Sequence, residues 1–251
     1  MIRISLLLTA TCLAAMAFAM PVSAAPKTDA EKAEIESIVR DYLLANPGIL
    51  REMADKLEAN DKLAEEAQRG KALMTYKDEV YKTASDPFVG SKKPDVTIVE
   101  FIDYNCGWCK KSMGEVASLV NSDKNIKVIF KDFPIFGEHS EYAAKAALAA
   151  EKQGKYWDLH QAMFAHEGQV TTEVVNQLAT AKGLDMTKLQ ADIASKEIGE
   201  RIAANMQLAK NLAINGTPAF VIDDKVYPGY LPIDGMNAAI ADVRKSGCKM
   251  C

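Results

Sequence analysis

Four of the five cysteines in this 251-residue chain form two pairs of the same spacing, Cys106/Cys109 and Cys248/Cys251. Such a pair can exchange disulfides or bind a metal, and the nucleophile in disulfide exchange is a thiolate. The start of a helix stabilises an anion, because its first N–H groups are unpaired and the helix dipole is positive there. If a helix begins at Cys106, then Cys109 lies on the same face and reaches the first sulfur. The first pair therefore predicts a redox-active disulfide, in which Cys106 attacks the substrate and Cys109 resolves the mixed disulfide.

Metal binding is the alternative for the first pair, because two such pairs together supply the four thiolates of a structural zinc centre. Zinc ribbons place their pairs on turns of small, loop-rich domains. Here the first pair lies between a run typical of a buried strand and an amphipathic segment, in a chain long enough for a sizeable core. The pattern favours disulfide exchange.

The segments around the first pair predict a βαβ unit. Residues 95–102 are nearly continuous in apolar and β-branched types, which is typical of a strand in the centre of a sheet. Helical spacing of apolar residues follows from 110 to 120, and residues 126–133 predict a second strand. Two strands joined through a helix run parallel with a right-handed crossover. The cysteine pair is then at the turn from strand to helix.

The chain between this unit and the second pair predicts several inserted helices and a return to the sheet. Residues 140–211 are rich in alanine and helical in pattern, with glycines as breaks. Residues 219–223 predict a strand that turns into 226–227, and a last helix is expected over 233–245. Three histidines of the inserted region lack metal-ligand spacing and are expected to pack helices or lie at the surface: His139, His160 and His166.

Residues 28–83 are charged and rich in Ala, Leu, Glu and Lys, which predicts helices. Asn46 and Pro47 interrupt them, and Asn46 is expected to cap the start of the second helix. This helical arm could pack on its own catalytic domain or against other copies of the chain. Thin amphipathic helices bury little area alone, so the pattern favours self-association, with a flexible connection near residues 85–87 or 90–94. Apolar residues recur at helical spacing on both sides of the break: Ile35, Ile38, Val39 and Tyr42, then Ile49, Leu50, Met53 and Leu57.

The N-terminus predicts a secretory signal peptide over residues 1–25. A positive charge at Arg3 precedes an uncharged, apolar run over residues 4–20, and small residues follow where a signal peptidase would cleave. A transmembrane anchor is the alternative, but the run is short for a bilayer. Cleavage would remove Cys12 and leave the mature protein in an oxidising compartment, for which a bacterial periplasm fits best. The net charge of −4, with both signs spread along the chain, predicts no nucleic-acid partner.

Two segments resemble the DsbA-type thioredoxin-fold proteins. They are residues 99–111, with the first cysteine pair, and residues 215–220, Asn-Gly-Thr-Pro-Ala-Phe. The resemblance covers roughly residues 86–245. It implies an α/β fold, a thioredoxin fold with an inserted helical subdomain at about 138–212, preceded by the N-terminal helical arm.

The resemblance also implies roles for residues outside the pair. Thr217-Pro218 would be a cis bond that faces the cysteines and docks the substrate backbone, and proline is the residue for which a cis bond costs little. Glu100 resembles the buried acid that assists proton transfer near the resolving cysteine, here Cys109, with a solvent-facing strand residue as the alternative.

Within this family, the arm and the segment 104–111 resemble the suppressor-of-copper-sensitivity C proteins, some of which self-associate through that arm. Several active sites around a shared cleft favour shuffling of disulfides, which indicates an isomerase. Gly107-Trp108 stands where the strongest oxidases carry Pro-His, so a milder potential is expected. Four divisions are predicted: a signal peptide (1–25), a helical arm (26–84), a thioredoxin-like catalytic domain (85–247) and a tail (248–251). Within the arm, residues 28–84 are expected to form the oligomer.

We therefore expect a periplasmic thiol-disulfide oxidoreductase that works as an isomerase or reductase through Cys106 and Cys109 and requires no bound cofactor. A DsbA-like oxidase and a copper-tolerance protein are the alternatives. The expected substrates are unfolded or misfolded exported proteins, and a membrane thiol-disulfide reductase or oxidase is expected to reset the pair. The protein is expected to be a homo-oligomer.

The second pair ends the chain as Cys248-Lys249-Met250-Cys251. Two thiolates and a thioether suit Cu(I), which makes a copper site one interpretation of this tail. A local disulfide or loose thiols in a flexible tail, and a redox relay to Cys106, are the alternatives.

Overall fold

The computed structural model describes residues 28–82 and 86–250. The predicted signal peptide, residues 1–25, and Cys251 lie outside the described residues. The chain divides into two compact units, one that ends at Leu57 and one that begins at Glu58. Within the described ranges, no helix has the length and apolar character that crossing a bilayer requires.

The first unit contains helix α1, Asp29–Ala45, and the first part of α2, Gly48–Thr75. Thr28 and Glu31 form a capping box, which satisfies free N–H groups at the start of α1. At the break, the Asn46 side-chain amide donates to the Tyr42 carbonyl at 2.8 Å. This side chain therefore caps the end of α1, whereas the sequence predicted a cap at the start of the next helix.

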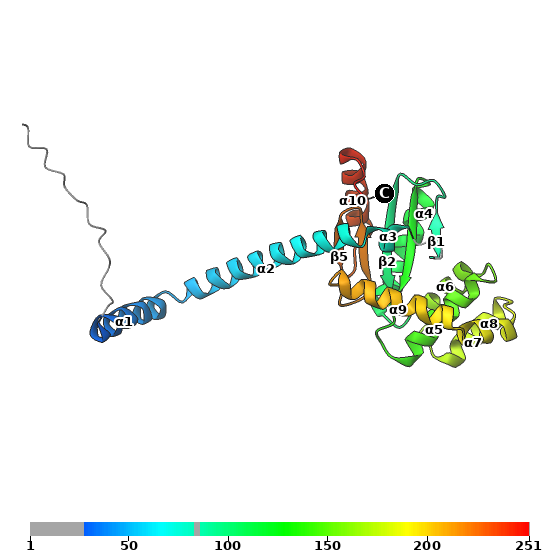
Figure 1. Ribbon diagram of the computed structural model, residues 1–251, viewed down its shortest axis with the longest axis horizontal. Helices are drawn as coiled ribbons and strands as arrows, with labels where there is room; N and C mark the ends of the chain where they lie inside the picture. The colour runs from blue at the N-terminus through cyan, green and yellow to red at the C-terminus, as the bar shows by residue number, and fades with distance from the viewer. Residues whose placement is uncertain (1–27, 83–85, 251) are drawn as a thin grey trace, which may run out of the picture. The chain divides into compact units, whose positions relative to one another are not determined.

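The second unit is built on a five-stranded sheet with the order β1-β3-β2-β4-β5 (Figure 1). Strands β2 and β3 are parallel and are joined through helix α4, Gly107–Ser122, which confirms the predicted βαβ unit. The other neighbouring strands pair antiparallel. The strands are β1 Phe88–Gly90, β2 Val96–Ile102, β3 Ile126–Asp132, β4 Ala219–Ile222 and β5 Lys225–Pro228. This arrangement is the predicted thioredoxin fold.

Strand β1 lies between the two segments, 85–87 and 90–94, in which the sequence predicted a flexible connection, and shares Gly90 with the second. Phe88–Gly90 pairs with β3 at the edge of the sheet. Gly90 has a φ of 93°, and a Cβ atom there would lie 2.4 Å from the Ile126 carbonyl oxygen, so only glycine fits. A strand of three residues is too short to show a period of two in the sequence.

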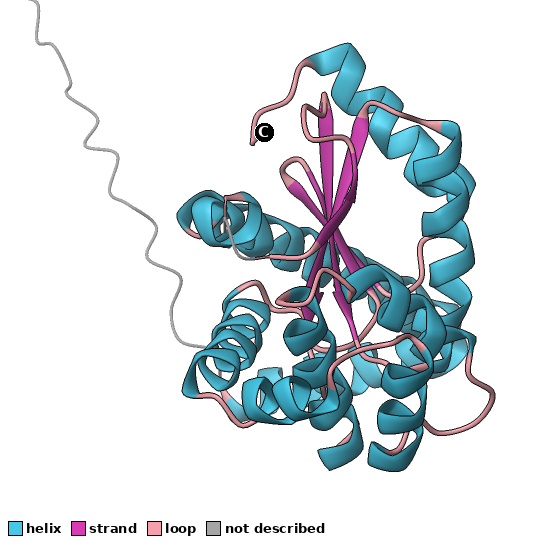
Figure 2. Ribbon diagram, turned by 90° about the vertical axis from the view of Figure 1, so that its right-hand side faces the viewer, coloured by secondary structure: helices cyan, strands magenta, loops and turns pink. Residues whose placement is uncertain are grey.

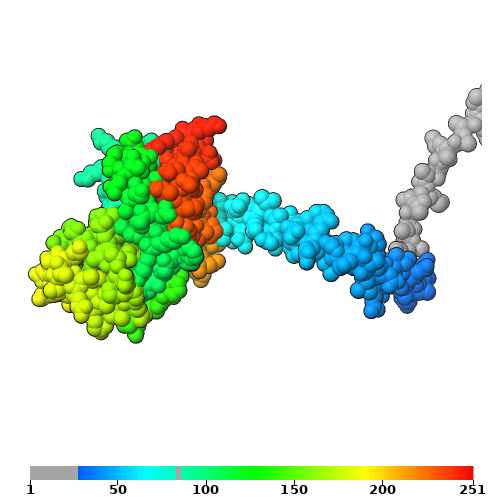
Figure 3. Space-filling view, turned by 180° about the vertical axis from the view of Figure 1, so that it is seen from behind, coloured from blue at the N-terminus to red at the C-terminus, as the bar shows by residue number. Residues whose placement is uncertain are grey.

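All seven residues of β2 are buried, because helices cover both faces of the sheet (Figure 2). Successive side chains of a strand point to opposite faces. Ile98 and Ile102 join the core cluster of α4 and of α10, Ile233–Ser246, which lies beside α4 (Figure 3). Val99 and Phe101 join the cluster on the other face. Glu100 stands between Val99 and Phe101 in the strand, so its side chain points to the opposite face, which α4 covers.

Five helices lie between β3 and β4, in the region predicted as a helical insertion. Six of the eight buried residues of α5 are alanines, whose small side chains let four neighbouring helices approach closely. The bounds are α5 Glu138–Glu151, α6 Tyr156–Ala165, α7 Thr172–Ala181, α8 Met186–Ile193 and α9 Lys196–Asn211.

The last part of the predicted arm packs on the sheet. Leu73, near the end of α2, is 1% exposed, and Val80 in the short helix α3, Lys77–Tyr81, is fully buried. Both belong to the cluster of Val99 and Phe101. The sequence left open whether the arm packs on its own domain or on other copies, and for this part the first alternative holds. The surface available for self-association is therefore shorter than the predicted 28–84.

Candidate redox-active site

A tight turn after β2 places Cys106 at the N-terminus of α4. The Cys106 N–H donates to the Asp103 carbonyl at 3.1 Å, and the Lys110 N–H donates to the Cys106 carbonyl at 3.1 Å, which opens the helix. Cys106 is the N-cap residue, and Cys109 lies in the first turn. Both are free thiols, 4% and 1% exposed. The strand thus delivers the pair to a helix start, as the sequence predicts.

The pKa of Cys106 is lowered from its ordinary value of 9.0 to about 6. The largest cause of this lower pKa is the hydrogen bond from the Cys109 side chain; Thr217 and the backbone N–H groups of Cys109 and Trp108 add to it, while burial opposes it. These N–H groups are the unpaired donors of the first helical turn. Cys106 is therefore mostly a thiolate, and hence a nucleophile, at neutral pH.

Cys109 has the opposite character. Burial, the hydrogen bond to Cys106 and the charge of Glu100 together raise its pKa far above the ordinary value. Glu100 is 2% exposed, and the Ser112 hydroxyl donates to its Oε1 at 2.9 Å. Burial raises the pKa of Glu100 to about 8, with the Ser112 hydrogen bond opposing this rise and the charge of Cys106 adding to it. The ionised form of Glu100 is a stronger base than an ordinary carboxylate, and it can accept the proton that Cys109 loses when it attacks. The solvent-facing alternative for Glu100 is wrong.

The Thr217–Pro218 peptide bond is cis, as the resemblance implies. It directly precedes β4, which pairs with β2, so the loop lies at the end of the sheet that carries the cysteine pair. The Thr217 carbonyl oxygen is 3.1 Å from Cys106 Sγ. The structure therefore brings five of the predicted site residues together: Cys106, Cys109, Thr217, Pro218 and Glu100.

Asp103 is a residue of the site that sequence reasoning missed. Its carboxylate is 1% exposed and accepts four hydrogen bonds. Oδ1 accepts from the Asn105 N–H and the Ser140 hydroxyl at 2.8 and 2.7 Å, and Oδ2 accepts from the N–H groups of Ile135 and Phe136 at 2.7 and 3.1 Å. These bonds hold the cysteine loop to the loop after β3 and to α5. An acid at the end of a buried strand, directly before the pair, was the available signal.

An aromatic surface flanks the pair. Trp108, between the two cysteines, is 57% exposed, and its ring lies 5.5 Å from that of Tyr230. The Lys111 ammonium group lies 4.5 Å from the centre of the Tyr230 ring, and the Tyr230 hydroxyl donates to the Glu115 carboxylate. Exposed rings held in this way offer apolar contact area beside the reactive sulfur.

His160 packs inside the protein core. His160 is fully buried, its Nδ1 is 2.9 Å from the Tyr104 hydroxyl, and its ring packs on Phe130 and Trp157. Burial lowers the pKa of His160 to about 3, so its ring is neutral. In the described ranges, 28–82 and 86–250, no three His, Cys, Asp or Glu side chains are grouped to hold a metal ion.

The C-terminal tail folds against the opposite end of β4. The N–H groups of Lys249 and Met250 donate to Asp223 Oδ1 at 2.7 and 2.8 Å, and Met250 is fully buried in the cluster of Leu73. Cys248 is disulfide-bonded. A disulfide sulfur and a buried thioether do not present the donors that Cu(I) needs, so the tail in this arrangement does not fit the predicted copper site.

Disulfide exchange needs a thiolate that attacks and a second thiol that stays protonated until it attacks the mixed disulfide. It also needs a group that accepts the proton of this second thiol. Cys106, Cys109 and Glu100 have these three properties, and a thioredoxin sheet holds them. The fold and the site thus define a thioredoxin-fold protein of the disulfide-exchange class.

Comparison with known proteins gives the family. Residues 97–241 match the DSBA-like thioredoxin domain, and residues 31–64 match the N-terminal domain of copper resistance protein ScsC. The first match covers more than half of the chain. This chain therefore belongs to the DsbA-like thioredoxin family, a family of thiol-disulfide oxidoreductases.

Solved structures agree with this assignment. A thioredoxin-like oxidoreductase of Silicibacter pomeroyi is 40% identical, with a TM-score of 0.66 over 67% of this chain and 97% of that one. A linker-deletion mutant of Proteus mirabilis ScsC is 27% identical, with a TM-score of 0.68 over 89% of this chain and 100% of that one. A periplasmic thioredoxin-like protein of Salmonella enterica serovar Typhimurium is 29% identical, with a TM-score of 0.61 over 66% of this chain and 93% of that one.

Curated relatives include Na⁺/H⁺ antiporters. NhaA 1 of Salinispora arenicola is 28% identical over 153 residues, which are 60% of this chain and 24% of the antiporter. This chain thus spans about a quarter of the length of the curated relatives that it matches.

Proposed function

We propose that this protein is an exported thiol-disulfide oxidoreductase that acts as an isomerase or reductase on disulfides of unfolded or misfolded proteins. The contrast between the two thiols carries the proposal. The pKa of Cys106 is lowered to about 6, whereas that of Cys109 is raised by burial. At neutral pH the Cys106 sulfur is therefore a thiolate that can attack, and the Cys109 sulfur is a protonated thiol.

The proposed reaction begins when the Cys106 thiolate attacks a substrate disulfide. A Cys106–substrate disulfide forms, and the second substrate sulfur leaves as a thiolate. In isomerisation, a substrate thiolate attacks this mixed disulfide at the substrate sulfur, which forms a new substrate disulfide and releases Cys106 unchanged. In reduction, Cys109 gives its proton to the ionised form of Glu100 and attacks Cys106. The substrate leaves reduced by two electrons, and the Cys106–Cys109 disulfide stores the oxidation.

Two features support isomerase or reductase work over the oxidase alternative. Gly107 and Trp108 supply no imidazole that would stabilise the thiolate further, so a milder potential is expected. The first unit carries an apolar surface suited to self-association, since Ile38, Tyr42 and Leu50 are 60–61% exposed and α1 buries none of its residues. This surface lies within the match to the ScsC N-terminal domain.

The proposed compartment is the bacterial periplasm. The predicted signal peptide and the need for an oxidising compartment support it, and one similar structure is described as periplasmic. A membrane thiol-disulfide reductase is the proposed partner that returns Cys106 and Cys109 to the dithiol form.

Refolding of scrambled ribonuclease tests this function. The mature wild-type protein is expected to restore ribonuclease activity, and a double variant of exposed arm residues, Ile38→Ser with Leu50→Ser, is expected to be monomeric and to lose most of that activity. The matched control replaces two exposed polar residues of the same helices, Asp41→Ser with Arg51→Ser, and should behave as wild type. No isomerisation by the wild-type protein, together with rapid oxidation of reduced ribonuclease, would favour the oxidase alternative.

A further inference from the structure

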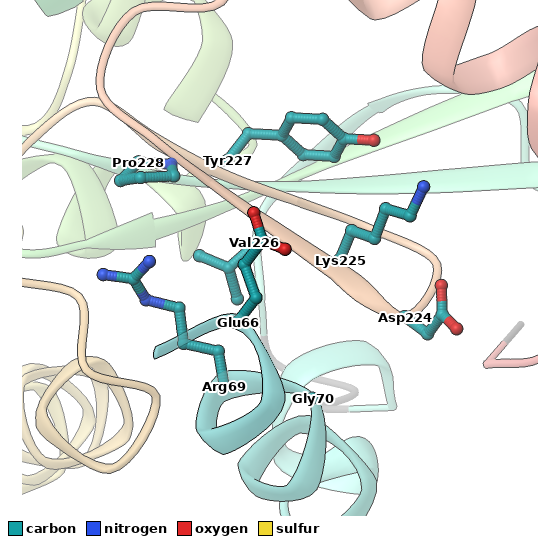
Figure 4. A pocket seen from close by; sticks show the side chains of 8 residues that line it. All are labelled: Glu66, Arg69, Gly70, Asp224, Lys225, Val226, Tyr227 and Pro228. Atoms are coloured by element: carbon teal, nitrogen blue, oxygen red, sulfur yellow. The ribbon is translucent and has the colours of Figure 1, made fainter. Parts of the chain in front are cut away.

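The C-terminal tail is bound to the turn between β4 and β5. Asp223 Oδ1 accepts from the N–H groups of Lys249 and Met250 at 2.7 and 2.8 Å, and Cys248 Sγ lies 3.3 Å from the same oxygen. The Lys249 ammonium group pairs with Asp224, which stands at the turn of this hairpin (Figure 4). Asp223 is 4% exposed, and a carboxylate so buried needs donors such as these two N–H groups.

The tail also contacts helix α3. The Lys77 ammonium group donates to the Lys249 carbonyl at 3.2 Å. The Tyr81 hydroxyl donates to the backbone carbonyl of Asp223 at 2.7 Å. Helix α3, the hairpin turn and the tail are therefore held together at one place, through both the side chain and the backbone of Asp223.

The segment that the tail contacts leads from the helical arm to the sheet. A hollow of about 410 Å³ lies between α2 and the edge strand β5, with Arg69 and Val226 in its wall (Figure 4). Leu73, about one helical turn further along α2, is buried and shares a core cluster with Met250. Met250 therefore packs at the place where α2 becomes buried.

Cys248 is half-buried and disulfide-bonded. Cys106 and Cys109 are free thiols, so neither is its partner. The other two cysteines, Cys12 and Cys251, lie outside the described residues, and removal of the predicted signal peptide leaves Cys251 as the partner within the mature chain. We call this bond the tail disulfide. A disulfide that closes a short loop restricts little of the chain, and a partly exposed sulfur is accessible to an attacking thiolate.

The first cysteine pair of the same chain is too far away to reduce the tail disulfide. Ile222, directly before Asp223, pairs with Ile98 near the start of β2, whereas Cys106 follows the end of β2. At about 3.3 Å per residue, the two sites are roughly 20 Å apart along the sheet. The electrons that reduce the tail disulfide therefore come from another molecule.

We propose that the tail disulfide is a second redox site of this protein, which a dithiol protein reduces and which holds the tail against α3 while it is oxidised. A thiolate of the dithiol attacks one tail sulfur, and the other leaves as a thiolate; the second thiol of the dithiol then displaces the attacked sulfur. The tail gains two electrons and two protons, and the dithiol becomes a disulfide. The proposal does not depend on the direction in which Cys106 and Cys109 work.

Reduction weakens the docking of the tail because a disulfide stabilises mainly by restricting the conformations of the undocked segment. The undocked tail gains conformations when the bond opens, whereas the docked tail gains few. For a loop of four residues, the docking equilibrium should weaken by about tenfold. Undocking withdraws Met250 from the core cluster and the Lys249 carbonyl from Lys77, so α3 loses part of its packing.

The test uses the full mature protein with Cys106→Ser and Cys109→Ser, so that the tail disulfide alone responds to the dithiol dithiothreitol. Hydrogen exchange followed by mass spectrometry reports on α3, where the Val80 N–H donates to the Tyr76 carbonyl at 3.0 Å. Alkylation followed by measurement of the intact mass counts the tail thiols in each sample.

We expect hydrogen exchange in residues 76–82 to be about tenfold faster in the reduced sample than in the oxidised one. Cys248→Ser should show the faster exchange with and without dithiothreitol. The matched control, Ser246→Ala, changes an exposed residue beside the tail and should keep both rates. The wild-type protein, with the thiols of the two pairs followed separately, should show the same change, so the result does not depend on the folding of the serine variant.

Two results would overturn the proposal. Equal exchange of α3 in samples whose tail is fully oxidised and fully reduced would show that the tail disulfide does not hold the tail. Reduction by dithiothreitol only in urea that unfolds the domain would show that the bond is structural and no redox site. Neither result bears on Cys106 and Cys109, whose function the refolding of ribonuclease tests.

Discussion

The buried carboxyl of Glu100 makes the stability of the reduced protein depend on pH in a defined direction. Burial raises the pKa of Glu100 from 4.5 to about 8. Between these two values the folded protein holds a proton that the unfolded chain has lost, so stability falls as pH rises from 4.5 to 8. At pH 7, which is 2.5 units above 4.5, the free energy of unfolding is lower by about 3 kcal/mol than it is at low pH, at 1.36 kcal/mol per pH unit. Glu100→Gln keeps the shape and the Ser112 contact without this titration.

The assay is urea unfolding of the reduced protein at several pH values between 4.5 and 8.5. Below pH 4.5 the wild-type protein and Glu100→Gln should differ little, whereas at pH 7 the variant should be more stable by about 3 kcal/mol. Both proteins carry Cys106, so the difference between their profiles isolates Glu100. Glu167→Gln, which changes an exposed carboxylate, should follow the wild-type profile.

The same substitution separates stability from activity. Because the glutamine amide in Glu100→Gln cannot accept a proton, attack by Cys109 should slow by about 10²- to 10⁴-fold, while the first attack by Cys106 is little changed. A variant whose stability difference is flat over this pH range, or whose Cys109 still resolves mixed disulfides at the wild-type rate, would refute the assignment of Glu100.

Two further predictions concern residues that hold the site and the tail. Asp103→Asn leaves buried N–H donors with a weaker acceptor, so the unfolding free energy should fall by about 2–4 kcal/mol. The control, Asp242→Asn on the exposed side of α10, should leave it unchanged. Urea titration measures both, and an Asp103→Asn protein as stable as wild type would contradict the hydrogen bonds assigned to Asp103. Met250→Ala creates a cavity in the core cluster of Leu73 and Val99 and should lower the unfolding free energy by about 2–4 kcal/mol. Lys245→Ala is the exposed control and should leave it unchanged. No loss for Met250→Ala would mean that the tail does not pack on the domain in solution.

The βαβ unit and the cysteine pair could be predicted because their signals are local. An apolar run, a Cys-x-x-Cys pair and a helical repeat follow one another within about thirty residues, in the range of one βαβ unit. The cis-proline loop is far away in sequence and depended on the family resemblance. The burial of Glu100 stayed open because β2 is buried on both faces, so an alternating pattern that would mark an outward side is absent.

What the sequence could not predict depends on contacts between distant segments. A helical pattern is the same whether the helix packs on another copy or on its own sheet, so the sequence did not show that Leu73 and Val80 join the core cluster of Val99 and Phe101. Asp103 joins segments about thirty residues apart, and Met250 reaches Asp223 across α10. Neither contact leaves a periodic signal in the chain.

The central claim is that Cys106 is the attacking thiolate, and its alkylation tests this most directly. The reduced protein is treated with iodoacetamide over a range of pH, and the modified cysteine is identified by mass spectrometry. The rate at Cys106 should rise with a midpoint near its pKa of about 6, while Cys109 stays unmodified. A midpoint near the ordinary thiol value of 9.0, or preferential alkylation of Cys109, would contradict the account.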